Sequence, residues 1–365
     1  MEYKRLEDIL DYIQPTNYIV ESEKYDDSFK TPVLTAGKSF LLGYTDEING
    51  IFNADFENPI ILFDDFTTDY KWVDFAFKVK SSACKILIPK TNVNLKYVFY
   101  AMKYVNIDTK LHKRYWISIF SKQLIPYPDN EIQTKIVMEL DKIHNQIKNN
   151  EEELMKFDEI VKSQFIEMFG TLDLSEERKE WVEIKDVSKI HTGTTPSTTD
   201  ETNWDGDILW ITPAEMNSKT FYVHDTVRKI TEKGKKSKSL DLMPVNTVLL
   251  STRAPIGKVG IVGVPMTCNQ GFKNFECCDK LNPIYLYTLL KNNTEYLNSL
   301  GSGTTFLEVS KSTISKLRIP LPDIKLQNKF ADFVQLIDKS KFIVQKQIEL
   351  LEELLEKKMN EYFGQ

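Results

Sequence analysis

Two long stretches of the chain space their apolar residues as one face of an α-helix does. After Asp129, apolar side chains recur every three, four or seven positions, from Ile132 to Met168. After Asp323, the same spacing runs from Leu326 to Tyr362. Such spacing keeps one apolar stripe along a helix. It predicts two long helices, each with an aspartate placed to cap its first turn, and polar runs at 149–153 and 339–341 predict a weakened or broken stretch midway in each.

The two stretches are copies of one another. Residues 317–364 align with residues 123–170 without a gap, and 11 of the 48 pairs are identical. Both copies begin with Ile-Pro-x-Pro-Asp and end with Phe-Gly. A helix this long cannot bury its stripe against one small domain, so each copy is predicted to pack on the other as an antiparallel coiled coil with a pseudo-twofold axis. Two unrelated amphipathic helices that pack locally are the alternative.

The segments before the helices are also related. Residues 181–187 repeat the pattern of residues 3–9, and residues 246–250 resemble residues 58–62. Short apolar runs between Gly, Asn and Pro turns are typical of strands. The fold class predicted is therefore α+β, with two globular mixed α/β regions and two long helices. The four segments are 1–125, 126–170, 171–318 and 319–365.

Composition narrows the class of protein. The chain has 365 residues, of which 41% are hydrophobic and 27% charged, which suits a globular protein of two or three compact regions. No apolar run is long enough to span a bilayer, and the amino terminus is not a secretory signal. Four cysteines show no metal-type spacing. These features predict a cytoplasmic protein in a reducing compartment that does not contact a membrane.

A search for catalytic motifs finds none. Asn58-Pro59 and Asn282-Pro283 are each followed by Ile, so the Asn-Pro-Pro-aromatic element of a methyltransferase is missing. Gly257-Lys258 lacks the remaining residues of a phosphate-binding loop. The four histidines have no partners at metal-ligand spacing. The chain is predicted to be non-catalytic, with no metal and no cofactor of its own.

Two basic stretches favour binding to nucleic acid. Residues 110–122 contain five Lys, Arg or His residues and no acidic residue, and residues 228–241 contain six Lys or Arg residues against two acidic ones. Clustered cations neutralise phosphates, and a loop can follow a DNA backbone. Solvated loops are the alternative. Two similar domains held by a spacer would match a DNA target made of two separated half-sites.

The chain resembles a known family, the DNA-specificity subunits of type I restriction-modification systems. The family enters each long helix through Ile-Pro-x-Pro followed by Gln, here Gln133 and Gln327. The second region carries Gly-Thr-Thr-Pro at 193–196, a Leu-Leu-Ser-Thr-Arg segment from 249, Asn-Gln-Gly at 269–271, and Gly303. The first region resembles another recognition-domain type, with motifs at 31–37, 43–45, 61–67 and 112–114. It lacks the Gly-x-Thr-Pro and Asn-Gln-Gly elements, so no residue-by-residue equivalence between the halves is expected.

The resemblance implies a non-catalytic reader of DNA. Residues 1–125 and 171–318 would be target-recognition domains, each binding one half of a bipartite double-stranded target, and 126–170 and 319–365 would be conserved spacer helices. Such subunits dock two DNA methyltransferase (M) subunits and, with restriction (R) helicase-nuclease subunits, form a complex that methylates adenine and cuts DNA with ATP. S-adenosylmethionine, ATP and magnesium belong to those partners.

Candidate DNA contacts follow from side-chain chemistry. Arginine can bridge guanine, and Asn or Gln can bridge adenine, whereas lysines serve phosphates. Alternatives stay open: a structural salt bridge for Arg253, a turn amide for Asn269 and Gln270, and a solvated turn for Asp64. Other function classes are a duplicated protein-binding scaffold with a coiled-coil spacer, or an active methyltransferase or nuclease. The candidates for base edges are Arg253, Asn269, Gln270, Arg114 and Asp64, and those for phosphates are Lys113, Lys235, Lys236, Lys238 and Lys258.

Overall fold

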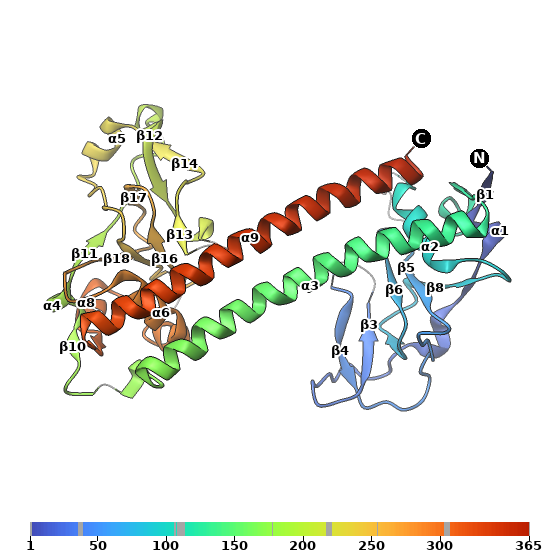
Figure 1. Cartoon of the computed structure of the whole chain (residues 1–365), viewed down its shortest axis with the longest axis horizontal. Helices are drawn as coiled ribbons and strands as arrows, with labels where there is room; N and C mark the ends of the chain where they lie inside the picture. Colours follow the sequence, from blue (N-terminus) through green and yellow to red (C-terminus); the bar gives the residue numbers. More distant parts are fainter. Residues whose placement is uncertain are drawn as a thin grey trace. The chain divides into compact units, whose positions relative to one another are not determined.

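The chain folds into two compact units. Unit 1 consists of Met1–Asn149 with Ile348–Gln365, and unit 2 of Asn150–Gln347. Each contains helices and strands, which confirms the α+β class (Figure 1). None of the helices described is both long enough and apolar enough to cross a membrane. This computed structural model describes residues 2–35, 39–105, 107, 114–176, 178–216, 221–253, 255–302 and 307–364.

A four-stranded antiparallel sheet forms the centre of unit 1. Its strand β5 (Ile60–Asp64) is buried along its whole length. Because successive side chains of a strand point to opposite faces, Ile61 and Phe63 pack in one core with helix α2 (Leu95–Ala101). Ile60 and Leu62 pack in a second core on the other face. The sheet has the order β2 (Leu10–Ile13), β8 (Cys84–Pro89), β5, β6 (Tyr70–Val73), and a small sheet has the order β4 (Leu41–Thr45), β3 (Thr31–Leu34), β7 (Lys78–Val79).

Unit 2 is built in the same way around strand β15 (Val248–Leu250). Val248 and Leu250 pack in the core that contains helix α6 (Pro283–Asn292), whereas Leu249 faces the core of the small sheet. The large sheet has the order β11 (Ser188–Thr192), β18 (Lys273–Cys277), β15, β16 (Val259–Val262), β13 (Tyr222–Val223), and the small sheet β14 (Arg228–Ile230), β12 (Trp204–Ile211), β17 (Met266–Cys268).

The two units share one topology although their motifs differ. In each large sheet the strand that comes first in the chain, β2 or β11, pairs with the strand that comes last, β8 or β18, and that strand also pairs with the central strand, β5 or β15. In each small sheet the central strand, β3 or β12, pairs antiparallel with the strand that follows it and parallel with the third strand. The missing Gly-x-Thr-Pro and Asn-Gln-Gly motifs of the first region therefore reflect different loops on the same framework.

A short strand and a helical turn precede the large sheet in each unit. Strand β1 (Tyr3–Arg5) pairs with β9 (Leu124–Pro126), and β10 (Val182–Glu183) pairs with β19 (Arg318–Ile319). The following turns are α1 (Leu6–Ile9) and α4 (Ile184–Val187). Leu6 N–H donates to Gln123 O at 3.1 Å, and Ile184 N–H to Leu317 O at 2.9 Å. This shared hydrogen bond confirms that residues 3–9 and 181–187 are equivalent.

The two long helices, α3 (Asn130–Phe169) and α9 (Ile324–Phe363), pack on each other in both units. In unit 2 the Lys341 ammonium lies 2.7 Å from Asp158 Oδ1, and the rings of Phe165 and Phe330 are 5.4 Å apart. Partner numbers fall along α9 as they rise along α3, so the pair is antiparallel, as predicted. In unit 1 the Lys358 ammonium lies 3.1 Å from Glu139 Oε1.

Both long helices are unbroken, so the predicted interruption at residues 149–153 and 339–341 is wrong. The helix is held by backbone hydrogen bonds between residues four apart. Glu, Lys and Gln are good helix formers even where they bury nothing. A polar run therefore interrupts the apolar stripe without interrupting the helix.

One tyrosine in each unit explains why the ends of the two long helices repeat the same residues. Tyr97 OH donates to Pro126 O at 2.9 Å, and Tyr285 OH to Pro320 O at 3.2 Å. The Tyr97 ring lies 5.5 Å from Phe363, and the Tyr285 ring 4.9 Å from Phe169. Each tyrosine thus joins the Ile-Pro-x-Pro start of one long helix to the Phe-Gly end of the other. The glutamines of the motif, Gln133 and Gln327, each donate to a proline carbonyl, Pro128 O or Pro322 O, at 2.8 Å.

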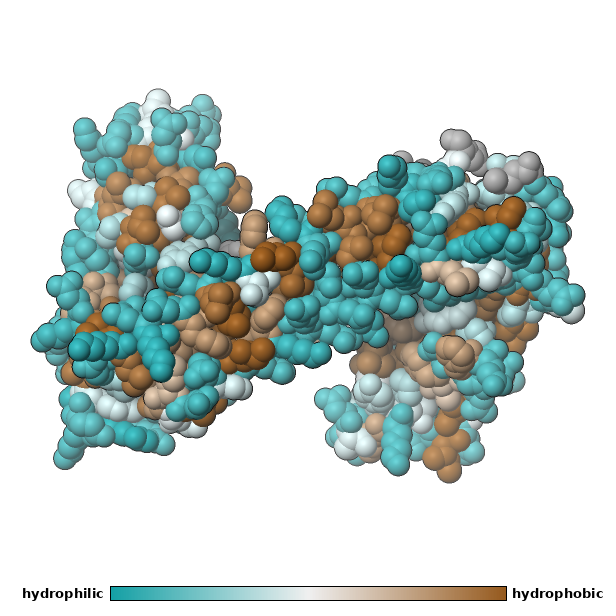
Figure 2. Space-filling view, in the orientation of Figure 1, coloured by the Kyte–Doolittle hydropathy of each residue, from teal (hydrophilic) through white to brown (hydrophobic). Residues whose placement is uncertain are grey.

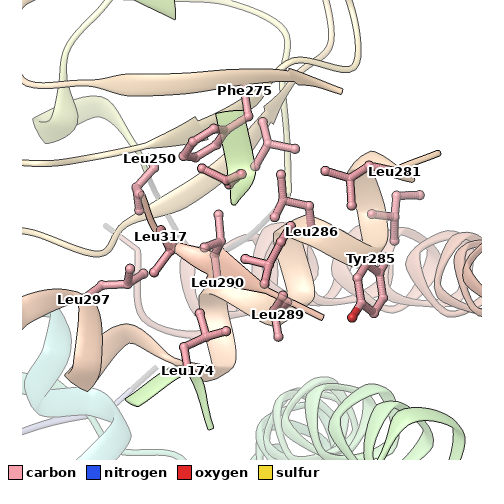
Figure 3. Close-up of a cluster of buried hydrophobic side chains, with 14 of the residues drawn as sticks. Leu174, Leu250, Phe275, Leu281, Tyr285, Leu286, Leu289, Leu290, Leu297 and Leu317 are labelled. Carbon is pink, nitrogen blue, oxygen red and sulfur yellow. The ribbon is translucent and has the colours of Figure 1, made fainter. Parts of the chain in front are cut away.

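The core of unit 2 includes side chains from the long helices as well as from the sheet. Figure 3 shows the residues of α6, among them Leu286 and Leu290, with Leu250 and Phe275 of the sheet. Phe165 of α3 and Phe330 of α9 belong to the same buried cluster. The long helices are therefore part of the domain core. The remaining helices are α5 (Glu232–Ser237), α7 (Thr294–Ser299) and α8 (Lys311–Ser315).

Candidate nucleic-acid interface

The motifs of the second region meet at one end of the unit 2 sheets. Thr195 Oγ1 donates to Gln270 Oε1 at 2.7 Å, which joins the Gly-Thr-Thr-Pro and Asn-Gln-Gly loops. Thr252 N–H donates to Gly271 O at 2.7 Å. Asn269 N–H donates to Ile211 O at 3.1 Å. Segments scattered over nearly eighty residues of sequence thus form one group of loops, which we call the motif cluster (residues 193–197, 211–213, 251–258 and 269–271).

The backbone around Gly193 leaves no room for a side chain. A Cβ on Gly193 would lie 1.9 Å from Cys268 O, too close for any side chain. We expect Gly193→Ala to destabilise unit 2 by about 3 kcal/mol, because backbone must move. Gly170→Ala is the matched comparison: Gly170 has open space but φ +80°, so it should cost only about 1 kcal/mol. Urea unfolding of both variants measures the difference, and equal losses would contradict the steric account.

Arg253 forms a salt bridge in this cluster. Its Nε lies 2.9 Å from Glu308 Oε2, and its side chain is 44% exposed. The other Glu308 oxygen lies 3.6 Å from the Lys273 ammonium. The guanidinium is therefore held in one orientation at the surface. The salt-bridge alternative and the DNA-contact prediction are compatible, since a fixed exposed Arg is already ordered for a ligand.

The two amides of the Asn-Gln-Gly loop differ in setting. Asn269 Oδ1 accepts the Gly271 N–H at 2.9 Å, so this side chain closes a turn. Gln270 is exposed, and its Oε1 accepts from Thr195. The turn role expected as an alternative for Asn269 is present, and Gln270 is the amide at the surface.

The lysines predicted to contact phosphate fall into two groups. The Lys258 ammonium donates to Pro213 O at 3.0 Å and Met216 O at 3.2 Å, which holds two loops together. Lys235 lies 3.7 Å from Glu232 Oε1. Lys236 and Lys238 are exposed, and no carboxylate of the described residues lies within 4 Å of either ammonium.

The unit 1 candidates are less uniform. Asp64 is buried, and Oδ1 accepts the Phe66 N–H at 2.8 Å while Oδ2 accepts the Thr67 hydroxyl at 2.7 Å. It shapes a turn, as the alternative held, but its carboxylate is buried rather than solvated, while Thr67 of the same turn is exposed. Arg114 is exposed, and its guanidinium carbon lies 6.0 Å from the centre of the Phe66 ring. Lys113, like the motif residues Gly37 and Gly303, lies outside the described residues.

Sequence reasoning missed three buried lysines, of which Lys78 pairs with Glu47 and the other two lie near the candidate arginines. Lys85 is 2% exposed and Lys273 is 7% exposed. Burial lowers the pKa of both, and the nearby carboxylates Asp65 and Glu308 oppose that shift. The available signal was a single lysine inside a strand-like apolar run, because a buried lysine needs partners. Within the part of the chain that the structure describes, no group of three or more His, Cys, Asp or Glu residues could hold a metal ion.

Comparisons with known proteins agree on one family. A family model described as "Type I restriction modification DNA specificity domain" matches residues 176–353. The Escherichia coli type I restriction enzyme EcoR124I/EcoR124II specificity subunit is 33% identical over 357 residues, which are 93% of this chain and 87% of that protein. The Methanocaldococcus jannaschii MjaIX specificity subunit is 39% identical over 200 residues, which are 53% of this chain and 46% of that one.

Solved structures share the fold. The crystal structure of a type I restriction-modification S subunit from M. genitalium gives a TM-score of 0.62 with 13% identity, over 99% of this chain and 96% of that one. A second chain, from work on complex assembly of the type I R-M system, gives 0.55 with 16% identity, over 99% and 97%. The near-complete match to the E. coli subunit identifies the chain as a member of the family of type I restriction enzyme specificity subunits.

Proposed function

We propose that this chain gives a type I restriction-modification complex its DNA sequence specificity by binding a bipartite double-stranded target, one half per unit. The observation that carries the proposal is that one framework occurs twice with different loops. Sheets with the same order of their shared strands position the loops in the same way, while different side chains at the loop tips present different donors and acceptors to base edges. Two unlike half-sites follow from two unlike loop sets.

We also propose a role for each segment and for each candidate side chain. Residues 1–125 and 171–318 act as recognition domains, and the segments 126–170 and 319–365 as spacer helices. The exposed side chains of Arg114, Arg253 and Gln270 contact bases. Lys236 and Lys238, with Lys113, contact phosphates. Asp64, Asn269 and Lys235 are already bonded within their own segments, and Lys258 to a neighbouring loop, so they act on DNA by shaping the loops.

Partner subunits are proposed to dock on the long helices. Large apolar side chains stay exposed there, and Figure 2 shows hydrophobic side chains gathered along α9. Apolar surface of this kind, rimmed by polar residues, marks protein interfaces. Because the helix occurs twice, two M subunits would bind, and the R subunits would join that assembly in the cytoplasm. Catalysis then belongs to the partners. The most exposed of these side chains are Met138, Met155, Leu336, Phe342, Ile343 and Leu350.

The phosphate role of Lys236 gives a sharp prediction. We expect Lys236→Ala, assembled with the M subunit, to weaken binding to all duplexes alike, with the slope of log affinity against log salt reduced by about 1. Lys233→Ala on the same helix is the control, because Lys233 is already 3.0 Å from Asp200 Oδ2 and should change the slope less. Fluorescence anisotropy over a salt series measures both. An unchanged slope in Lys236→Ala would exclude a phosphate contact.

The function itself is tested by methylome sequencing of cells that carry this chain with its M subunit. A split adenine-methylated motif should appear with the chain and disappear without it. The scaffold alternative makes the opposite prediction, because a protein-binding scaffold would leave the methylation pattern unchanged and would not shift duplex DNA in a salt-sensitive way.

A further inference from the structure

A buried lysine occupies the same structural position in each unit. Asp65 N–H donates to Ala83 O at 2.9 Å, and Thr252 N–H donates to Gly271 O at 2.7 Å. Lys85 and Lys273 follow those two acceptor residues by two positions, on strands β8 and β18. The lysines are therefore equivalent in the two sheets, although no sequence motif joins them.

The segment that leads to the Ile-Pro-x-Pro motif of each long helix, which we call the return segment, is equivalent as well. Tyr115 N–H donates to Asp65 O at 2.8 Å, and Val309 N–H donates to Thr252 O at 2.9 Å. Tyr115 precedes Ile125 by ten residues, as Val309 precedes Ile319. The preceding residues, Arg114 and Glu308, consequently occupy matching positions. By the same register the residue after Asp65, Phe66, matches the residue after Thr252, Arg253.

The same two positions face each other in both units. The arginine occupies the loop position in unit 2 and the return-segment position in unit 1. In unit 2, Arg253 of the β15–β16 loop contacts Glu308 of the return segment. In unit 1, Phe66 of the β5–β6 loop lies beneath Arg114 of the return segment. Each unit thus places one guanidinium at this location. In both units the arginine lies near enough to the buried lysine to lower its pKa, in addition to the larger effect of burial.

A carboxylate lies beside each lysine, and it also bonds the backbone near Arg114 in unit 1 and the side chain of Arg253 in unit 2. The Lys85 ammonium lies 3.5 Å from Asp65 Oδ2, while Asp65 Oδ1 accepts the Trp116 N–H at 2.8 Å. Asp65 therefore fixes the backbone just after Arg114. The Lys273 ammonium lies 3.6 Å from Glu308 Oε1, while Glu308 Oε2 contacts Arg253. The buried carboxylate of Asp65 needs a cation beside it, which Lys85 supplies, whereas Glu308 is partly exposed and binds two cations.

We propose that Lys85 and Lys273 are matched positioning residues, each holding the arginine with which its unit contacts one half-site, Arg114 in unit 1 and Arg253 in unit 2. The inference rests on the proposed function and adds to it the residues that orient the base contacts. It also assigns the two arginines to different halves of the target. Arginine bridges guanine through two hydrogen bonds, and that geometry requires a fixed guanidinium.

The experiment compares motifs methylated in cells that carry the M subunit with the wild-type chain or a variant. Arg253→Ala and Lys273→Met are expected to relax the same base positions in one half of the motif. Arg114→Ala and Lys85→Met are expected to relax base positions in the other half. Discrimination between bases at these positions should fall roughly 5- to 150-fold. Lys78→Met is the matched control. Lys78 is also buried, with Glu47 Oε2 and Asn49 O each at 2.7 Å, so its variant should lose stability and keep a strict motif.

Milder variants keep the test decisive if a lysine variant does not fold. Asp65→Asn retains an oxygen for the Trp116 N–H but removes the charge, and Glu308→Gln does the same beside Arg253. If all the lysine and carboxylate variants keep a strict motif, as Lys78→Met should, the positioning role of Lys85 and Lys273 is overturned. Relaxation of the same half by Arg114→Ala and Arg253→Ala would overturn the assignment of halves. A wild-type chain that produced no split motif would instead overturn the proposed function.

Discussion

Replacing Phe330 with alanine is expected to destabilise unit 2 by about 3–5 kcal/mol. Phe330 is fully buried, and its ring lies 5.4 Å from Phe165 and 5.6 Å from Phe169 of the partner helix. Truncation removes the transfer free energy of a whole ring and leaves a cavity between two long helices that cannot close around it. Urea unfolding followed by circular dichroism measures the loss in free energy of unfolding.

Phe342 on the same helix provides the matched control. It is 63% exposed, so Phe342→Ala should change the free energy of unfolding by no more than about 0.5 kcal/mol. Its expected effect is on assembly, because it belongs to the apolar surface proposed to dock the M subunit. Equal destabilisation by the two substitutions would mean that the antiparallel contact contributes little to unit 2.

The long helices could be predicted because their information is local and repeated. A helix shows its buried face every three or four residues, and the same face recurs in residues 123–170 and 317–364. The Ile-Pro-x-Pro-Asp-x-x-x-Gln pattern adds a defined start, which the structure explains through the hydrogen bonds of Gln133 and Gln327. The polar middle was misjudged because side-chain polarity affects the packing of a helix more than its backbone.

The resemblance of residues 246–250 to 58–62 could be seen in the sequence, but the residue-by-residue register of the two sheets could not be predicted because insertions hide it. The offset between matching residues grows from 178 at Tyr3 and Trp181 to 188 at Lys85 and Lys273, and to 194 at Ile125 and Ile319. Strand pairing joins residues far apart in sequence, and its register depends on turns that a single sequence does not specify. The hydrogen bonds to Ala83 and Gly271, together with the strand pairings, align the two lysines.

Some of the candidate DNA contacts are bonded within the protein and others are not, and the sequence could not separate them for a related reason. Residue type suggested that Asp64 and Lys258 could contact DNA, but each is bound by backbone groups from its own or a neighbouring loop. Such partners depend on tertiary structure. Lys236 is exposed and has no carboxylate partner among the described residues. The spacing of basic residues along the chain indicates a residue of this kind only in part.

The composition of the unit 2 core predicts where a recognition domain can be cut from the chain. Phe165, Phe330 and Val334 of the long helices are buried in the same cluster as the sheet and α6. A fragment of residues 171–318 lacks all three. At roughly 1.5–3 kcal/mol for each buried side chain, it forgoes roughly 5–9 kcal/mol, which is comparable to the whole stability of a typical domain.

We therefore expect residues 150–347 to unfold cooperatively and residues 171–318 to show no cooperative transition. The longer fragment retains the parts of α3 and α9 that complete the core, and it keeps the pairing of β10 with the whole of β19. Differential scanning calorimetry of the two fragments measures the difference, and Phe330→Ala in the longer fragment should bring it toward the behaviour of the shorter one. A sharp transition in residues 171–318 would mean that the recognition domain folds without its helices, and that the helices contribute only the attachment of the loops.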